Sequence, residues 1–374
     1  MVQNQPTKPT ALIVGVTGMV GLSLAEALNS PKALGGPWRV FGSARRSPPT
    51  WFPSSTLDNF LAFDATNYSE TMQILSPFAT EITHVFWVAL QVRDNEEENI
   101  DINKTMLQNV LNVLVKTSPN SSLKHVCLQT GSKHYMGPIF QRGSYVPHDP
   151  PFQENMERLP YPNFYYALED TLFSFCQSSI TYSIHRPSRI IGASSRSFYS
   201  MLTTMSVYAT ICKFEGLPFR FPGNKYTWEH FFDMSDARFI AEQQIWAAGT
   251  EEAKNQAFNC TNGDVCSWKI VWKVLCEAHE VEFVPFDEGQ EFDWLGEMKM
   301  KEKVWDDIVD HFDLYKTKFD EVTCLDAADI VLHFENQYVS SMNKSREFGF
   351  LGYVDSLKSL GFWIDRLKKM KIIP

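Results

Sequence analysis

The sequence predicts a doubly wound α/β protein, in which helices cover both faces of a parallel sheet, with a smaller and mainly helical C-terminal lobe. Short apolar runs suited to buried strands recur through the first half of the chain, each about one helix apart. Helical patterns of apolar residues fill the intervals between these runs. The length, 374 residues, exceeds what one modest core usually organises, which favours two lobes.

The predicted elements of the first half alternate between strands and helices. The strands are expected at residues 11–14, 39–42, 61–63, 84–88, 125–129 and 181–185. The helices between them are expected at residues 22–28, 105–115 and 166–175, and the Pro- and Ser-rich pieces 47–55 and 117–122 are expected to be loops. This order is typical of a parallel sheet with helical crossovers.

The second half is predicted to be a lobe that covers the substrate. Residues 1–192 are expected to form the sheet domain and residues 193–374 the lobe, with one strand near 257–260 returning to the sheet. Helices are predicted at 202–212, 240–248, 268–278 and 302–312. The short charged runs 94–98 and 368–371 are predicted to be solvated faces.

Composition excludes several classes of function. With 34 Lys and Arg against 44 Asp and Glu, the net charge of −10 argues against nucleic acid as a partner. The 7 cysteines are odd in number and scattered, which predicts neither a disulfide framework nor a zinc site and fits a cytoplasmic protein. No apolar stretch is long enough to span a membrane, so no membrane association is expected.

A glycine motif follows the first predicted strand. Gly15, Gly18 and Gly21 have the spacing G-x-x-G-x-x-G and lead directly into the first helix. Such a loop permits a tight turn and a close backbone approach, and it leaves helix N–H groups free for a pyrophosphate. A simple strand-to-helix turn is the alternative. At the first strand of this α/β pattern, the motif predicts a Rossmann-type dinucleotide-binding domain, with Thr17 and Met19 also near the cofactor.

Two arginines follow the second strand. Arg45 and Arg46 occupy the place where an acidic residue would bind a ribose 2′-hydroxyl. Since guanidinium groups pair with a 2′-phosphate, the predicted cofactor is NADP(H) and not NAD(H). Asp64, at the end of the third strand, is expected near the adenine, although a simple turn aspartate is the alternative.

The residues for a chemical step depart from the common dehydrogenase pattern. A Tyr-x-x-x-Lys pair is absent at the candidate tyrosines, because Glu169 and Asp170 stand four residues after Tyr165 and Tyr166. Lys133 follows the strand 125–129, at the carboxyl end of the sheet, where such folds place reacting groups. From the residues alone, a solvated lysine and two packing tyrosines remain the alternatives.

Several strings along almost the whole chain resemble the progesterone 5β-reductase/iridoid synthase family of short-chain dehydrogenases/reductases. The strings that carry the resemblance are Gln129-Thr-Gly-Ser-Lys-His-Tyr-Met-Gly-Pro138, His148-Asp-Pro-Pro-Phe152, Asn163-Phe-Tyr-Tyr-Ala-Leu-Glu-Asp170, His185-Arg-Pro187 and Lys371-Ile-Ile-Pro374. The resemblance implies NADPH-dependent 1,4-reduction of the C=C bond of an enone or enal, without a metal. It also leads us to expect a homodimer.

The resemblance implies roles for individual residues. Lys133 and Tyr165 would be catalytic, with the phenol acting as a hydrogen-bond donor to the carbonyl oxygen on which negative charge develops. Beyond the residues argued above, it implies cofactor contacts from Asp64, Ala65, Ala89, Gln129, Ile190, Ser197 and Phe198. The expected substrate contacts are Leu90, Tyr199, Ala328 and Tyr338.

The chain departs from the family where substrate is held. Leu90 stands where many members have a tryptophan, and Ala328 and Tyr338 stand at positions that are aromatic in the family. Loss of large apolar walls changes which substrate fits. A carbonyl reductase or nucleotide-sugar epimerase on the same scaffold, and a non-catalytic NADPH-binding regulatory protein, are the alternative functions.

Overall fold

The structure is a computed structural model that describes residues 8–116, 118, 120–139, 145–176, 179–289 and 292–374. Its main sheet has seven strands, all parallel, in the order β10-β6-β5-β4-β1-β2-β3. The strands are β1 (Thr10–Val14), β2 (Arg39–Ala44), β3 (Asn59–Ala62), β4 (His84–Trp87), β5 (His125–Gln129), β6 (Thr181–Pro187) and β10 (Gln256–Cys260). The strand order reverses beside β1, which pairs with both β2 and β4.

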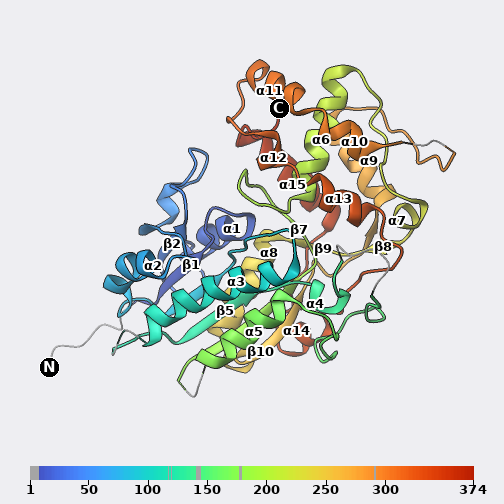
Figure 1. The fold of residues 1–374 in the computed structure, drawn as a ribbon. Coiled ribbons are helices and arrows are strands. Elements are labelled where there is room, and N and C mark those ends of the chain that lie inside the picture. The colour runs from blue at the N-terminus through green and yellow to red at the C-terminus, as the bar shows by residue number, and fades with distance from the viewer. Residues whose placement is uncertain (1–7, 117, 119, 140–144, 177–178, 290–291) are drawn as a thin grey trace.

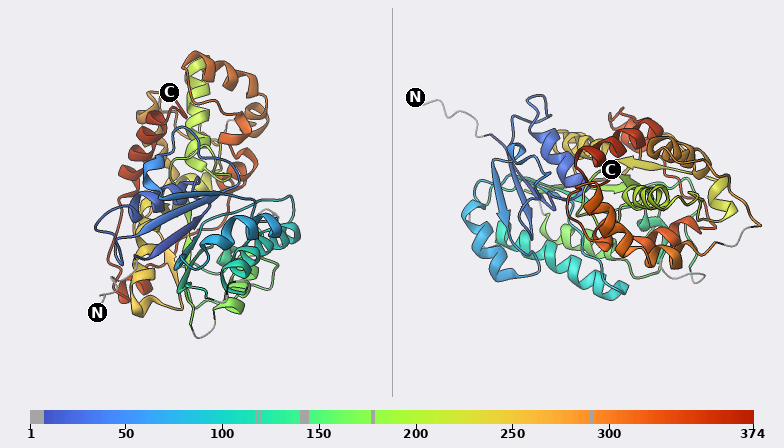
Figure 2. Two further views of the ribbon diagram at one scale, coloured as in Figure 1. Left: turned by 90° about the vertical axis from the view of Figure 1, so that its left-hand side faces the viewer. Right: turned by 90° about the horizontal axis from the view of Figure 1, so that it is seen from above.

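Helices cover both faces of this sheet, as Figures 1 and 2 show. One face carries α1 (Met19–Leu28) and α8 (Ala237–Gly249), and the other carries α2 (Tyr68–Leu75), α3 (Glu96–Leu111) and α5 (Phe164–Phe175). Successive residues of β1 alternate between the two cores: Ala11 and Ile13 face the α1 side, whereas Leu12 and Val14 face the α3 side. The doubly wound fold class is therefore confirmed.

The C-terminal part is mainly helical, as predicted, and stands beside one end of the sheet (Figure 1). Its helices are α6 (Met201–Glu215), α7 (Lys225–Glu229), α9 (Trp268–His279), α10 (Trp294–Lys299), α11 (Glu302–His311), α12 (Phe319–Val322), α13 (Leu325–Leu332) and α15 (Ser356–Lys369). Its core is continuous with the core under α1 and α8. The chain does not stay in this lobe, because α8, β10 and α14 (Asn343–Glu347) pack with the sheet.

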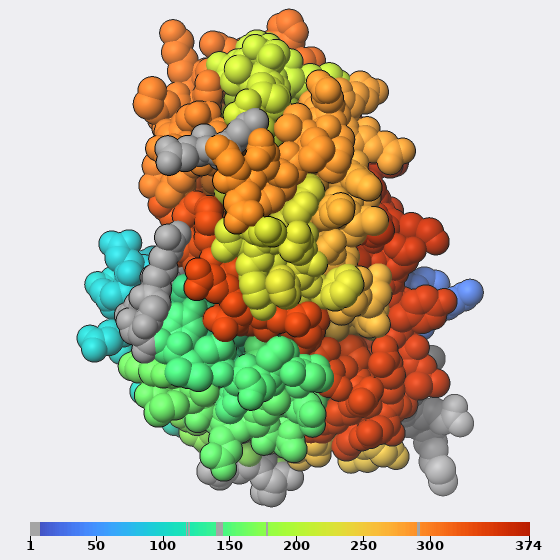
Figure 3. Space-filling model, turned by 90° about the vertical axis from the view of Figure 1, so that its right-hand side faces the viewer, coloured from blue at the N-terminus to red at the C-terminus, as the bar shows by residue number. Residues whose placement is uncertain are grey.

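Short strands tie the lobe to the sheet domain. β7 (Arg189–Ile191) pairs with β9 (Met234–Asp236), and β8 (Phe231–Phe232) pairs with β11 (Cys266–Ser267). Isolated bridges join Phe152 to Ser340 and Phe232 to Tyr338. In Figure 3 the red C-terminal segment accordingly lies between the green part of the chain that follows β5 and the yellow-green and orange lobe.

One predicted helix begins much earlier than expected. The helix predicted at 105–115 is α3, which starts at Glu96 and ends at Leu111, where a π-helical turn (Asn112–Lys116) follows. Asn95 caps it, because its Oδ1 accepts from the Glu98 amide at 2.9 Å and its Nδ2 donates to the Glu98 carboxylate at 2.8 Å. The prediction relied on apolar residues at helical spacing, and because the first turn of α3 consists of acidic residues, the start of the helix was not recognised.

Three further properties concern the chemistry that the fold allows. All seven cysteines are free thiols. In the described residues, no group of His, Cys, Asp or Glu is arranged to hold a metal ion. Among the helices of those same residues, none is both long and apolar enough to cross a bilayer.

Candidate active site

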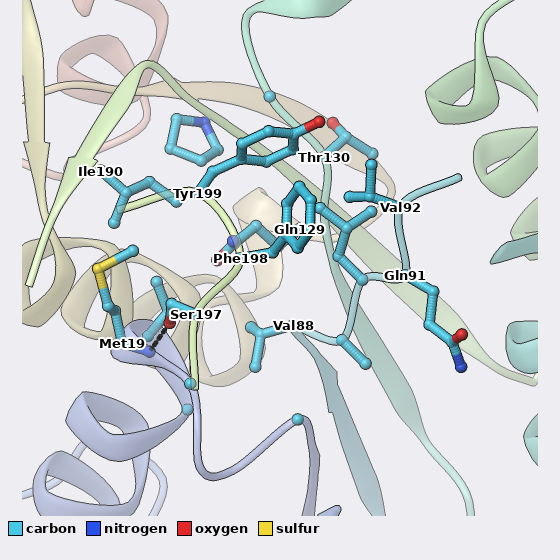
Figure 4. A pocket seen from close by; sticks show the side chains of 18 of the residues that line it. Met19, Val88, Gln91, Val92, Gln129, Thr130, Ile190, Ser197, Phe198 and Tyr199 are labelled. Carbon is cyan, nitrogen blue, oxygen red and sulfur yellow. Dashed lines mark hydrogen bonds between the residues drawn. The ribbon is translucent and has the colours of Figure 1, made fainter. Parts of the chain in front are cut away.

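A cavity of about 420 Å³ lies at the carboxyl edge of the sheet, between the sheet domain and the helical lobe. It opens beside β1 and β4, at the point of reversal where ligands bind in such folds. Figure 4 shows around it Val88, directly after β4, Gln129, at the end of β5, and Ile190, within β7. Of the predicted site residues, the structure brings together at this cavity Gly15, Thr17, Gly18, Met19, Arg45, Arg46, Ala65, Ala89, Leu90, Gln129, Lys133, Tyr165, Ile190, Ser197, Phe198, Tyr199, Ala328 and Tyr338.

Asp64 is the predicted site residue that does not line the cavity. Its Oδ1 accepts hydrogen bonds from the amide and the hydroxyl of Thr66, at 2.9 and 2.8 Å. This is the turn geometry that an aspartate makes with its own backbone two residues on. Its neighbour Ala65 is at the cavity instead.

The glycine loop has the close packing that its spacing predicts. Gly15 has φ +96° and lies so near the next strand end that a Cβ would come within 2.9 Å of the Ala89 backbone. At Gly21 a Cβ would meet the Gly15 carbonyl oxygen at 2.2 Å. Gly18 is the N-cap of α1 and provides no side-chain cap, and the Met19 amide donates to Ser197 Oγ at 3.0 Å (Figure 4). The start of α1 therefore faces the cavity with a backbone suited to a pyrophosphate.

Basic side chains gather at the end of β2. Arg45 and Arg46 are both exposed and line the cavity, and Arg46 forms an ion pair of 3.4 Å with Glu321 of α12. Arg196, which the sequence analysis missed, also lines the cavity and donates to the Ser47 carbonyl at 2.7 Å. Only the fold brings this third guanidinium to the other two, since it lies about 150 positions later in the chain.

Backbone and side-chain hydrogen bonds hold the segments that carry Lys133 and Tyr165 in place. Ser132 donates its amide to the Pro187 carbonyl at 2.8 Å, which holds the start of α4 (Lys133–Met136) against the end of β6. Asn163 caps α5 by accepting from the Tyr165 amide at 3.0 Å, and its Nδ2 donates to the Lys133 carbonyl at 3.1 Å. One asparagine therefore links the backbones of both predicted catalytic residues.

The Tyr165 hydroxyl lies against Gly131. A Cβ at Gly131 would come within 2.8 Å of that oxygen, so the loop after β5 needs a glycine for the phenol to sit there. In the described part of the chain, the structure shows no hydrogen bond to this hydroxyl, which is thus available to a ligand. Burial raises the pKa of Tyr165 above its ordinary value, and the negative charge of Glu96 adds to this. The phenol is consequently a proton-bearing donor at neutral pH.

Tyr166 has a different place. Its hydroxyl donates to the His134 carbonyl at 2.6 Å and accepts from the Leu159 amide at 3.0 Å, and it does not line the cavity. Of the two adjacent tyrosines, Tyr165 therefore faces the cavity, whereas Tyr166 has a structural role.

Tyr166→Phe is expected to reduce stability and to change activity little. The substitution removes two hydrogen bonds and leaves a buried carbonyl and a partly buried amide without that partner, a loss of roughly 1–3 kcal/mol. Thermal unfolding of the two proteins at equal concentration measures it, and a melting temperature lower by several degrees is the expected result. An unchanged melting temperature would contradict the structural placement of this hydroxyl.

Glu96 is a site residue that the sequence analysis misplaced. Its run, 94–98, was predicted to be a solvated face, and for Glu96 this is wrong. One carboxylate oxygen binds Lys133 Nζ at 2.5 Å, and the other accepts from the Phe164 amide at 2.7 Å. Its spacing from the buried Asn99 and Asn103 puts it on the inward stripe of α3, but the burial of these asparagines is shown by the structure and not by their residue types.

The predicted substrate contacts form another part of the cavity lining. Leu90 is 38% exposed and borders the open cavity. Tyr338 packs edge-on to Phe334 at 4.6 Å, and Ala328 on α13, although fully buried, belongs to the cavity lining. Arg189, also missed, lines the cavity with its guanidinium over the Phe232 ring at 4.7 Å.

This fold and cavity define a two-lobed Rossmann-type protein. Comparison with known proteins narrows the class, because the model of the PRISE-like Rossmann-fold domain matches residues 60–374. The chain belongs to this family. It is 47% identical to a 3-oxo-Delta(4,5)-steroid 5-beta-reductase of Arabidopsis thaliana, over 99% of this chain and 95% of the relative. It is also 45% identical to an (S)-8-oxocitronellyl enol synthase of Catharanthus roseus, over 98% and 93%.

Solved structures with lower identity share the fold. The UDP-glucose 4-epimerase of Thermus thermophilus in complex with NAD aligns with a TM-score of 0.64 at 14% identity, over 96% of this chain and 99% of that one. A second, the UDP-glucuronic acid 4-epimerase of Bacillus cereus with NAD, gives 0.63 at 14%, over 97% and 99%. At such identity the likeness concerns the architecture and not the reaction.

Proposed function

We propose that the protein is an NADPH-dependent reductase of the C=C bond of α,β-unsaturated carbonyl compounds. The observation that carries the proposal is that Tyr165 and Lys133 line one cavity together with the glycine loop. Membership of the family, and the reductase among its relatives, support it. The proposed substrate is a small molecule that contains an enone or enal.

The cofactor that fits this cavity is NADP(H). The start of α1 would hold the pyrophosphate, because Gly18 contributes no side-chain cap and the close-packed Gly15 and Gly21 have no side chains in the way, while the Met19 amide donates to Ser197. Arg45 and Arg46 would hold the 2′-phosphate through charge-assisted hydrogen bonds, with Arg196 beside them. When bound, the nicotinamide supplies a hydride.

Residues of the chain then stabilise the negative charge that develops on the carbonyl oxygen of the substrate. Hydride addition at the β-carbon moves negative charge to the carbonyl oxygen, where the Tyr165 hydroxyl donates a hydrogen bond. Because burial keeps its pKa high, the phenol stays protonated while it does so. Lys133 contributes positive charge beside the developing enolate and orients the phenol or a ribose hydroxyl. The α-carbon takes its proton from water or from these groups.

The alternatives predict other products from the same assay. We would follow NADPH oxidation with 2-cyclohexenone and identify the product by gas chromatography and mass spectrometry. Cyclohexanone supports the proposal, whereas 2-cyclohexenol would make the protein a carbonyl reductase. Binding of NADPH with no turnover of any enone or enal would favour the regulatory protein. An epimerase would interconvert nucleotide sugars without net NADPH consumption.

Leu90→Trp is expected to change which substrates are favoured. An indole in place of the exposed leucine adds apolar contacts for a small ring and removes volume needed by a large one. The Michaelis constant should fall for 2-cyclohexenone and rise for a steroid enone. The ratio of their kcat/KM values should shift by about 1–3 kcal/mol. An unchanged ratio would mean that residue 90 does not face the substrate.

A further inference from the structure

We propose that Glu96 is a positioning residue that fixes both the location and the charge of Lys133, and with them the placement of Tyr165. The inference rests on the proposed function, because it assigns Glu96 a role in that reaction. The observation behind this inference is that the two oxygens of the Glu96 carboxylate contact two different helices of the site. α3 supplies Glu96, α4 supplies its cationic partner, and α5 supplies its backbone partner.

The contacts are short and largely shielded from solvent. The Lys133 and Glu96 side chains are 8% and 15% exposed, and their Nζ and Oε2 atoms are 2.5 Å apart. The same ammonium lies 4.6 Å from the centre of the Phe164 ring. A buried ion pair of this kind leaves a strongly unfavourable lone charge when one partner is removed.

The second oxygen of Glu96 anchors the helix that carries the tyrosine. It accepts from the Phe164 amide, an otherwise unpaired donor in the first turn of α5 and one residue before Tyr165. An anion at a helix N-terminus is also favoured by the helix dipole. The carboxylate thus sets the distance between the Lys133 amine and the start of the tyrosine helix.

The electrostatic surroundings of Lys133 are simple. Burial lowers its pKa, and the negative charge and hydrogen bond of Glu96 oppose this. Among the other titratable side chains that line the cavity are Tyr165, Tyr199 and Cys324. Burial raises the pKa of each of these three, so all are neutral near pH 7. Glu96 is therefore the group that opposes the effect of burial on the pKa of this amine and favours its charged form, which can place positive charge beside an enolate.

Two substitutions separate the contributions of charge and anchoring. Glu96→Gln retains an oxygen for the Phe164 amide but removes the negative charge, whereas Glu96→Ala removes both. Without the carboxylate, burial alone acts on Lys133 and its pKa falls further. The basic limb of the kcat profile should consequently move to lower pH in Glu96→Gln, while turnover near neutrality changes less. Glu96→Ala should lose turnover at every pH and also unfold at a lower temperature.

A double-mutant cycle with Lys133→Met tests whether Glu96 acts through the lysine. At the pH where the wild type has half its maximal kcat on the basic limb, Glu96→Gln should reduce kcat about fivefold or more, the effect at that pH of a pKa lower by one unit. In the Lys133→Met background the same change should alter kcat less than about twofold. Equal effects in the two backgrounds would overturn the proposal. Glu97→Gln, an exposed neighbour in the same turn, is the matched control and should leave the profile unchanged.

A second measurement does not depend on turnover. Competitive acetylation with acetic anhydride from pH 6 to 11, quantified on the Lys133 peptide by mass spectrometry, reports the titration of that amine in the full chain. The Lys133 midpoint should lie at least about one pH unit lower in Glu96→Gln than in wild type and Glu97→Gln. A shifted midpoint without enone reduction by the wild type would refute the proposed function but support the pairing. An unshifted midpoint in an active enzyme would refute the role of Glu96 alone.

Discussion

Replacement of Tyr165 by phenylalanine is expected to reduce kcat by roughly 10²–10³-fold, the effect of removing one oxyanion donor. The phenyl ring keeps the packing against Phe164 and Gly131, so the loss is confined to the hydroxyl. Since the hydrogen bond strengthens as the enolate forms, kcat and kcat/KM should fall together. Steady-state kinetics with a saturating enone measures this directly.

Cofactor binding and stability provide the controls for that variant. The dissociation constant of NADPH, measured by fluorescence, should remain within a few-fold of wild type, and the melting temperature should change little. Tyr166→Phe should show the opposite pattern, with lower stability and nearly normal turnover. If Tyr166→Phe instead abolished turnover while Tyr165→Phe did not, the hydroxyl that faces substrate would be the other one of the pair.

The double substitution Arg45→Ala and Arg46→Ala is expected to raise the Michaelis constant for NADPH on the order of ten- to a thousandfold. One or two charge-assisted contacts of ~1.5–3 kcal/mol each are lost with the 2′-phosphate. NADH lacks this phosphate, so its Michaelis constant should barely change. The ratio of kcat/KM for the two cofactors is the quantity to measure.

Arg39→Ala separates a direct contact from a general effect of charge. Arg39 lies at the opposite end of the same strand and pairs with Glu81 at 2.6 Å. The substitution Arg39→Ala removes one positive charge far from the cavity, so the preference for NADPH over NADH should stay the same. Equal losses with NADPH and NADH in the double variant would contradict the assignment of a 2′-phosphate site at Arg45 and Arg46.

The sheet could be predicted from sequence because its strands are buried on both faces. Continuous apolar runs such as β1 and β5 need no tertiary information to be recognised, and the glycine spacing located the loop that follows β1. Adjacent residues on such strands enter different cores, so the runs show no alternation of apolar and polar residues. The helix α15 was missed although Leu360, Trp363, Ile364 and Leu367 have helical spacing, since the aromatic-rich half offered few clear boundaries.

The site residues that were missed depend on tertiary contacts. Arg196 reaches the basic group only because the loop after β7 folds back to Ser47. Glu96 is followed by two other acids, Glu97 and Glu98, and its burial follows from the docking of α3 against α5. Asp64 was expected near adenine from its place after β3, but local hydrogen bonds to Thr66 compete for its carboxylate. The position of an aspartate after a strand does not by itself show whether its carboxylate faces a ligand or accepts hydrogen bonds within its own turn.

The position of transferred hydrogen tests the proposed reaction most directly. The protein would be incubated with 2-cyclohexenone and NADPH carrying two deuterium atoms at C4 of the nicotinamide, and the product would be analysed by NMR. The proposed 1,4-reduction predicts cyclohexanone with one deuterium at C3, the former β-carbon. Deuterium at C1 of 2-cyclohexenol would show attack on the carbonyl itself and would contradict the account.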